Sequence, residues 1–135
     1  MKRFFSVLVV ALITVGFLTA AAPVPNTTFT LIEGLPPVMD VGEMHTVVVQ
    51  VDSDQEFISV TSLPSFEYAG KGVVVVQGGD RSGRGTSATL ELTFKAKSTT
   101  ARMANGVAPV HVVVGVRYGG GYVAVQEYIF NVMVP

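Results

Sequence analysis

Cysteine and tryptophan are both missing from this chain of 135 residues. Without cysteine there can be no disulfide, no thiol nucleophile, no thiolate ligand for a metal and no lipid-modified cysteine. Many exported domains of this size depend on disulfides for their stability. We therefore expect this chain to be held together by the packing of its apolar side chains alone.

Charged side chains are also scarce. They make up 14% of the chain, against about 25% in an average protein, and the formal net charge is −1. A balance so close to neutral gives no reason to expect a nucleic acid as partner. Hydrophobic residues reach 49%, which argues against a disordered chain and is enough to build the core of one domain.

The N-terminus has the three parts of a secretory signal peptide. Lys2 and Arg3 supply positive charge, the run Phe4–Leu18 is apolar, and Thr19–Ala22 ends in small residues. This order of charged, apolar and small segments is typical of a leader that is removed on export.

We predict a signal peptide over residues 1–21, with cleavage after Ala20 or Ala21, and a domain over residues 22–135. The product would be secreted, periplasmic or held at the cell surface, with no membrane span after cleavage. An uncleaved anchor stays open as an alternative, because the apolar stretch reaches 19 residues at Ala22 and a spanning helix needs about 20.

The rest of the chain is dense in β-branched residues and is interrupted at short intervals by glycine and proline. Such a pattern is typical of strands and turns, and no segment has the spacing of an amphipathic helix. Turns are expected over Asp52–Gln55 and Gly119–Gly121. We predict strands over Thr27–Glu33, Met44–Asp52, Phe57–Ser62, Val73–Gln77, Thr86–Lys97, Pro109–Tyr118 and Tyr122–Val134, and a short edge strand over Phe66–Tyr68.

Apolar residues occupy every second position in three of these strands, which predicts one buried face for each. The continuous valines of Val73–Gln77 instead predict a strand that is buried on both faces or lies beneath a loop. The residues expected to face the core are Val47, Val49, Val51, Ala88, Leu90, Leu92, Phe94, Ala96, Val110, Val112, Val114 and Val116.

The last predicted strand breaks its own alternation. Val123 and Val125 have one parity, whereas Tyr128, Phe130, Val132 and Val134 have the other. A bulge of one residue would place all six side chains on the core face. We therefore predict a bulge at Gln126–Glu127.

The stretch Val41–Val51, in which Val-Gly-Glu leads into alternating threonine and valine, resembles the entry to the second strand of bacterial immunoglobulin-like surface modules. The segments Val110–Tyr118 and Tyr122–Val134, joined by three glycines, are similar to their last two strands. The resemblance implies an all-β fold, an immunoglobulin-like antiparallel β-sandwich of about seven strands. It says little about function, and the cysteine pair and tryptophan of antibody domains are absent.

Asp52, Asp54 and Glu56 lie at alternate positions beside a predicted turn, and oxygen ligands with such a spacing can bind calcium. The stretch lacks the turn glycine and the distal glutamate of the well-known calcium loop. We interpret it as a solvated turn.

His45 and His111 are the only histidines, and Met44, Met103 and Met133 could join them in a copper site, because imidazole and thioether suit copper. Parity places His45 on the inward face of its strand and His111 on the outward face of another, which separates them. A periplasmic copper-handling function is kept as the alternative.

Ser82 lies among glycines in the polar segment Gly78–Gly85, but the pattern of a nucleophile elbow is absent. No helix follows the glycines to bind a phosphate. Paired carboxylates for glycoside chemistry cannot be judged here, since their pairing is spatial. We expect no catalytic residue, no cofactor and no metal site, and a protein that is not an enzyme.

Charge is divided unevenly along the chain. Residues 4–70 hold seven acidic side chains and no lysine or arginine, whereas residues 71–117 hold seven basic and two acidic ones. Strands that kept these charges apart would allow copies to associate head to tail. Interleaved strands would instead pair the charges locally.

These observations lead to an exported, non-enzymatic binding or structural module, which presents loops or an edge strand to a protein or glycan at the cell surface. The segments 78–85 and 98–108 are the expected contact loops, because function concentrates on loops carried by a rigid scaffold.

Overall fold

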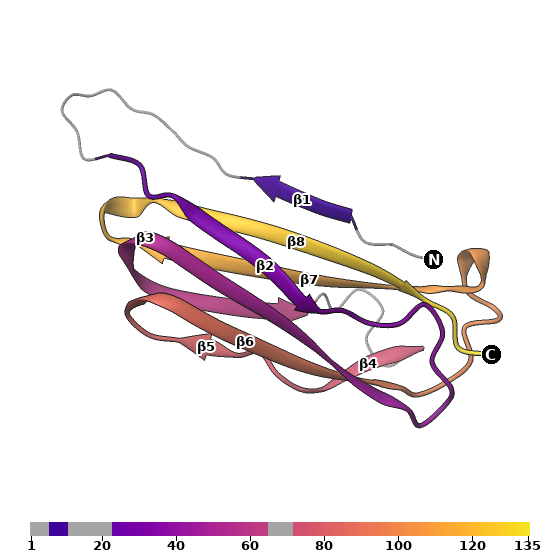
Figure 1. Ribbon diagram of the computed structural model, residues 1–135. Helices are drawn as coiled ribbons and strands as arrows, with labels where there is room; N and C mark the ends of the chain where they lie inside the picture. Colours follow the sequence, from indigo (N-terminus) through magenta and orange to yellow (C-terminus); the bar gives the residue numbers. More distant parts are fainter. Residues whose placement is uncertain (1–5, 11–22, 65–71) are drawn as a thin grey trace.

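The computed structural model describes residues 6–10, 23–64 and 72–135. In these segments the fold is all-β, and the helical pieces are two 3-10 turns, Ala104–Gly106 and Gly119–Gly121 (Figure 1). The strands are β1 (Ser6–Val10), β2 (Thr27–Glu33), β3 (Met44–Pro64), β4 (Val73–Gln77), β5 (Arg81–Ser82), β6 (Gly85–Ala96), β7 (Ala108–Tyr118) and β8 (Val123–Val132).

Every pair of neighbouring strands is antiparallel. The hydrogen-bonded order is β1-β8-β7-β3-β6-β4, and β2 and β5 also pair with β3. Seven of the eight strands lie within residues 22–135, which agrees with the number predicted for the domain. None of the helices described here has the length and apolar character needed to cross a membrane.

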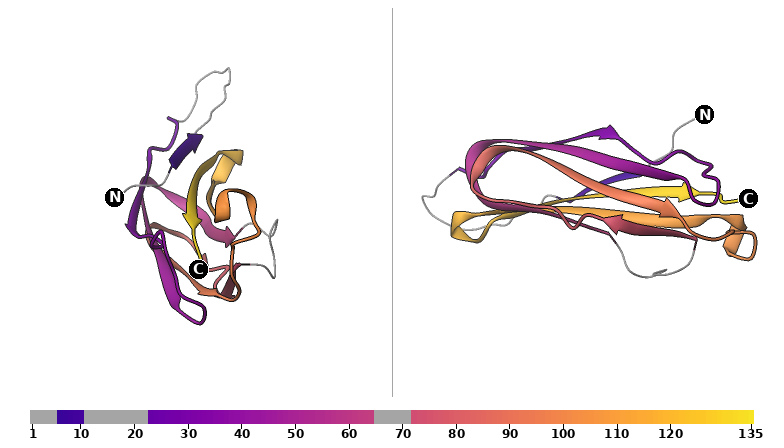
Figure 2. Two further views of the ribbon diagram at one scale, coloured as in Figure 1. Left: turned by 90° about the vertical axis from the view of Figure 1, so that its right-hand side faces the viewer. Right: turned by 90° about the horizontal axis from the view of Figure 1, so that it is seen from below.

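β3 joins the two halves of the fold. Its first part, up to Asp52, pairs with β2 and β6, and its second part, from Phe57, pairs mainly with β7 and β5. The register shifts between Asp52 and Phe57, and there the chain turns back along the molecule (Figures 1 and 2). The predicted turn at Asp52–Gln55 is therefore a bend inside one long strand rather than a break between two.

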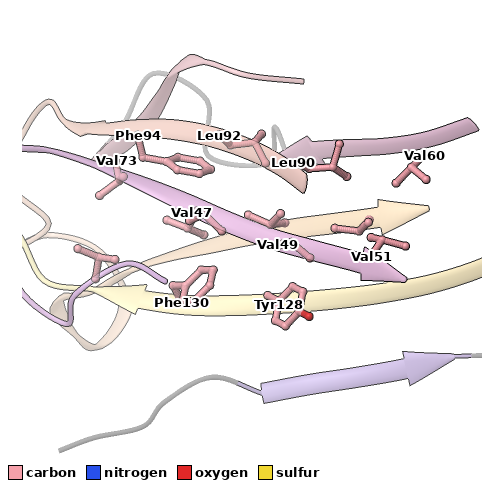
Figure 3. Packing of buried hydrophobic residues seen from close by; sticks show 14 of the residues in the cluster. Val47, Val49, Val51, Val60, Val73, Leu90, Leu92, Phe94, Tyr128 and Phe130 are labelled. Atoms are coloured by element: carbon pink, nitrogen blue, oxygen red, sulfur yellow. The ribbon is translucent and has the colours of Figure 1, made fainter. Parts of the chain in front are cut away.

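The core lies between the two halves of this bent sheet. Figure 3 shows side chains from β3, β6 and β8 pointing into one shared interior. The predicted core residues of β3, β6 and β7 are all buried, and Met39, Phe57, Val60, Tyr128, Phe130 and Val134 join them in one cluster. The buried hydrophobic side chains of residues 23–64 and 72–135 lie between Met39 and Val134.

The packing of these buried side chains supplies stability of the size that disulfides supply in other domains. Burial of one valine or leucine side chain contributes about 1.5–3 kcal/mol. A disulfide typically contributes about 2–4 kcal/mol. Two buried valines therefore match one disulfide, and β7 alone buries four of them, at Val110, Val112, Val114 and Val116.

The predicted bulge at Gln126–Glu127 is wrong. β8 pairs with β7 in one unbroken register, from Ala108 opposite Val132 to Arg117 opposite Val123. The uninterrupted ladder keeps the alternation of β8 intact. As a result Gln126 is buried with Tyr128 and Phe130, and the two valines, Val123 and Val125, lie on the opposite face.

The prediction for Val73–Gln77 had two alternatives, burial on both faces or a position beneath a loop, and burial on both faces is wrong. β4 pairs with β6 alone, so it is an edge strand, and only Val73 is buried while Val76 is 48% exposed. The predicted strand Phe66–Tyr68 lies outside the described residues. So do the predicted cleavage positions and most of the predicted signal peptide, of which the structure describes only Ser6–Val10, as β1.

Candidate functional site

The three candidate calcium ligands each interact with a different partner around the bend of β3. Asp52 Oδ1 accepts a hydrogen bond of 3.1 Å from a serine hydroxyl of β6. Asp54 Oδ1 accepts one of 2.8 Å from the backbone N–H of Asn26. Glu56 lies 3.7 Å from the guanidinium of Arg84. These carboxylates brace the bend against neighbouring segments and do not converge on a common point.

The two histidines are held by two different glutamates. His45 Nε2 lies 2.5 Å from Glu43 Oε2, and the hydrogen bond from His45 is the main cause that lowers the pKa of Glu43. His111 Nδ1 lies 2.9 Å from Glu127 Oε2.

The methionines that could have joined the histidines are also dispersed. Met44 and Met133 are exposed, whereas Met103 packs against the core. Within residues 6–10, 23–64 and 72–135, no three of the histidine, aspartate and glutamate side chains are grouped so as to hold a metal ion.

The strands that carry the acidic and the basic residues of the sequence are interleaved in the sheet. β3, which carries the acidic residues of the bend, lies between β6 and β7, and both of these strands carry basic residues, Lys95 and Arg117. The arrangement agrees with the interpretation that interleaved strands pair opposite charges locally, as Glu56 and Arg84 do.

The first predicted contact loop, residues 78–85, is largely tied to the sheet. The side chain of Asp80 accepts a hydrogen bond from the backbone N–H of Glu91, and its carbonyl accepts one of 2.9 Å from the backbone N–H of Ser62. Arg81 and Ser82 then pair with β3 as the short strand β5. Ser82 is therefore a residue of the sheet, and only the turn before Gly85 projects from it.

The second predicted contact loop, residues 98–108, is fixed by a buried threonine. The hydroxyl of Thr100 donates to the carbonyl of Gly106 at 2.7 Å and accepts from the backbone N–H of Val134 at 2.9 Å. The backbone N–H of Thr100 donates to the carbonyl of Val134 at 3.0 Å. Thr100 thus ties this loop to the C-terminal segment.

A shallow cleft of about 220 Å³ lies where the end of β3 approaches β4. Its lining contains no charged side chain and no histidine, and it borders Pro64, after which the described residues are interrupted. The lining residues are Leu63, Pro64, Val75, Val76, Gln77, Gly78 and Gly79.

The strand β8 offers a different kind of surface, because one of its edges bears backbone groups that β7 does not use. At the hairpin, the N–H of Tyr118 donates to the carbonyl of Tyr122 at 2.9 Å, which makes these two residues a hydrogen-bonded pair. Such pairs alternate along an antiparallel ladder, and the register with β7 is unbroken. The backbone groups that face away from β7 are therefore those of Val123, Val125, Glu127, Ile129 and Asn131.

This edge lacks the features by which proteins usually protect an exposed strand. Native edges are blunted by short length, bulges, proline, glycine or lysine. β2 has a register shift after Leu31, β4 is five residues long and also shifts, and β5 has two residues. β8 runs for ten residues without a shift, and its sequence VAVQEYIFNV has one charged side chain, that of Glu127, which is held by His111.

The outward face beside this edge carries exposed apolar side chains among charged ones, since Val113 lies opposite Glu127 and Val123 opposite Arg117. Val113 on β7 is 36% exposed, Leu63 on β3 is 49% exposed and Val123 on β8 is 50% exposed. Leu63 is paired with Val113 in the register of β3 and β7. Apolar side chains on the solvent side of neighbouring strands mark an interaction surface when they are contiguous.

The edge of β8 is occupied by β1. Ser6–Val10 pairs with β8 in antiparallel register, from Ser6 opposite Ile129 to Val10 opposite Val125 (Figure 1). Every residue of β1 belongs to the predicted signal peptide. The edge is thus able to accept a strand, and the strand that it accepts is one that export is expected to remove.

The sequence analysis missed this site although its signal was present. The parity of Val123 and Val125 differs from that of Tyr128, and we attributed the difference to a bulge. An unbulged strand instead places apolar residues on the outer face, which is what the structure shows.

No family model matches this chain, and neither does any curated protein.

Proposed function

We propose that this chain is an exported, non-enzymatic binding module with an immunoglobulin-like sandwich fold, and that it binds an extended segment of a partner protein along the edge of β8. The observation that carries the proposal is that, along this ten-residue edge free of bulges, Val125–Ile129 are paired with a strand of the predicted leader, whereas the segment of the domain that bonds to the same edge does so just past its end, at Met133. Once that leader is removed, the edge is a template for strand addition.

The immunoglobulin-like part of the proposal is supported by the arrangement of the core. The two parts of β3 face each other across one cluster of buried side chains, as the inner faces of a sandwich do. The glycine turn before β8, where Gly120 and Gly121 have positive φ angles of 86° and 93°, supports the resemblance of the closing hairpin.

A protein partner fits this edge better than a glycan. The outward N–H and C=O groups of β8 recur at every second residue, which matches the spacing of another extended polypeptide. Val123, on β8 itself, is 50% exposed and suits an apolar side chain of the added strand. The two predicted loops, in contrast, are committed to contacts within the domain through Asp80 and Thr100.

The test uses a chain that begins at Ala22, since it retains all the buried hydrophobic residues described above. The probe is a synthetic peptide of alternating threonine and valine with a lysine at each end. We expect the peptide to slow hydrogen exchange at the amides of Val125, Glu127 and Ile129, with a Kd on the order of micromolar.

The specific variant is Val125→Pro, which removes an outward N–H and leaves the ladder with β7 intact. It should weaken peptide binding by about tenfold or more, whereas Val76→Thr, an exposed valine on the distant edge strand β4, should leave the Kd within a factor of about three. Binding that protects the loops instead of β8, or that is unchanged in Val125→Pro, would refute strand addition. Binding of a panel of oligosaccharides but of no peptide would favour a glycan partner.

A further inference from the structure

The pairing of β1 with β8 has a consequence for the unprocessed chain. The outward backbone groups of β8 lie at odd-numbered residues, and three of these residues, Val125, Glu127 and Ile129, are opposite residues of β1. Because pairs alternate in an antiparallel ladder, the partners that hydrogen-bond to these groups are Val10, Leu8 and Ser6.

We infer that Ser6–Val10 is an internal occupant of the binding edge, so that the unprocessed chain is closed to partners and removal of the leader opens it. This inference rests on the proposed function of the β8 edge. It also defines the chemistry of the occupant: an antiparallel, uncharged strand of at least five residues, of the kind that Ser-Val-Leu-Val-Val exemplifies.

The occupant is effective because it is tethered. Val10 and Thr27 are separated by 16 residues in the same chain, and a strand carried in the chain acts at an effective concentration on the order of millimolar. A free peptide at micromolar concentration therefore competes poorly with it.

The pairing of Ser6–Val10 with β8 would also protect the chain before the leader is removed. An uncovered edge of ten residues is a site of aggregation through pairing with other chains. A strand carried in the same chain covers that edge until processing takes it away.

The experiment compares hydrogen exchange in the full chain of 135 residues, held in a mild detergent, with that in the chain beginning at Ala22 under the same conditions. We expect the amides of Val125, Glu127 and Ile129 to exchange at least about tenfold more slowly in the full chain. The full chain should also bind the threonine–valine peptide at least about tenfold more weakly.

Two neighbouring substitutions in the full chain test whether the hydrogen bonds from β1 to β8 cause the slower exchange and the weaker peptide binding. Leu8→Pro removes an N–H that faces β8 and should restore both rapid exchange and peptide binding. Val7→Pro removes an N–H that faces away from β8 and should change neither by more than a factor of about three. If the chain beginning at Ala22 and the full chain bind the peptide equally well, the closing role of Ser6–Val10 is refuted, while the proposed binding at β8 still stands. A processed chain that does not bind the peptide would overturn the proposed function.

Discussion

Thr100 and Ser62 are both fully buried hydroxyl residues with opposite hydrogen-bonding situations. Thr100 is bonded to Gly106 and Val134, whereas the hydroxyl of Ser62 has no partner among the described residues. Both types of residue look alike in the sequence. Only the position of distant backbone groups distinguishes a buried anchor from a buried hydroxyl that costs stability.

Thr100→Val keeps the size of the side chain and leaves the N–H of Val134 and the carbonyl of Gly106 without their partner. We expect a loss of about 1–3 kcal/mol in the free energy of unfolding, measured by urea denaturation. Ser62→Ala is the matched comparison and should be neutral or stabilising by up to about 1 kcal/mol. Equal destabilisation by both changes would contradict the hydrogen-bond assignment.

Tyr128 makes the free energy of unfolding depend on pH in the alkaline range. Burial raises the pKa of Tyr128 from 10 to about 12, so the unfolded chain releases this proton at lower pH than the folded chain. The stability that depends on protonated Tyr128 is fully present below pH 10 and is lost as the pH rises from 10 towards 12. At pH 12 the loss relative to neutral pH should be about 2 kcal/mol, seen as a falling urea midpoint.

Tyr128→Phe serves as the control for other groups that titrate in this range. The variant should lose less stability than the original chain between pH 10 and pH 12. Parallel curves for the two chains would show that Tyr128 is not responsible.

At the scale of the element, the edge between β4 and β6 depends on one glycine. Gly78 has a φ of 146°, and a Cβ added there would lie 2.9 Å from Cδ2 and 3.0 Å from the Cα of Leu92. The backbone of Leu92 cannot move away without disturbing the core that its side chain joins. We expect Gly78→Ala to lower the free energy of unfolding by about 2 kcal/mol or more.

Gly83→Ala is the control for this prediction, because a Cβ at Gly83 meets nothing within 4 Å. It should change the free energy of unfolding by no more than about 0.5 kcal/mol. A change of similar size for Gly78→Ala would contradict the prediction. It would mean that the segment 78–80 can move away from β6 without loss of stability.

The strands were the most predictable elements. Three strands with strict alternation, those that bury Val47, Leu92 and Val112 among others, were predicted with the correct inward face, because side chains alternate with a period of two whatever the strand pairs with. β4 and β8 were misjudged in part. Whether an apolar side chain of a strand is covered depends on which strand or layer lies beside it, and that information is not local.

At the scale of the whole molecule, the single cluster of buried residues predicts a single cooperative transition. The chain beginning at Ala22 should unfold in one step, with coincident urea curves from circular dichroism and tyrosine fluorescence. The reason is that both parts of β3 contribute to the same core, so neither half can retain its packing alone. Two separate transitions would contradict this prediction.

The sequence by itself determined the positions of most strands, the inward faces of three of them and the reliance on packing without disulfides. Each of these follows from composition or from a local repeat of side chains. Only the tertiary structure decided that β3 bends to join two halves, that Asp80 and Thr100 tie down the expected contact loops, and that β8 has a long edge without bulges on which β1 pairs. These features depend on hydrogen-bond partners far apart in the chain, such as Thr100 and Val134, and such partners are chosen by the register and packing of whole strands.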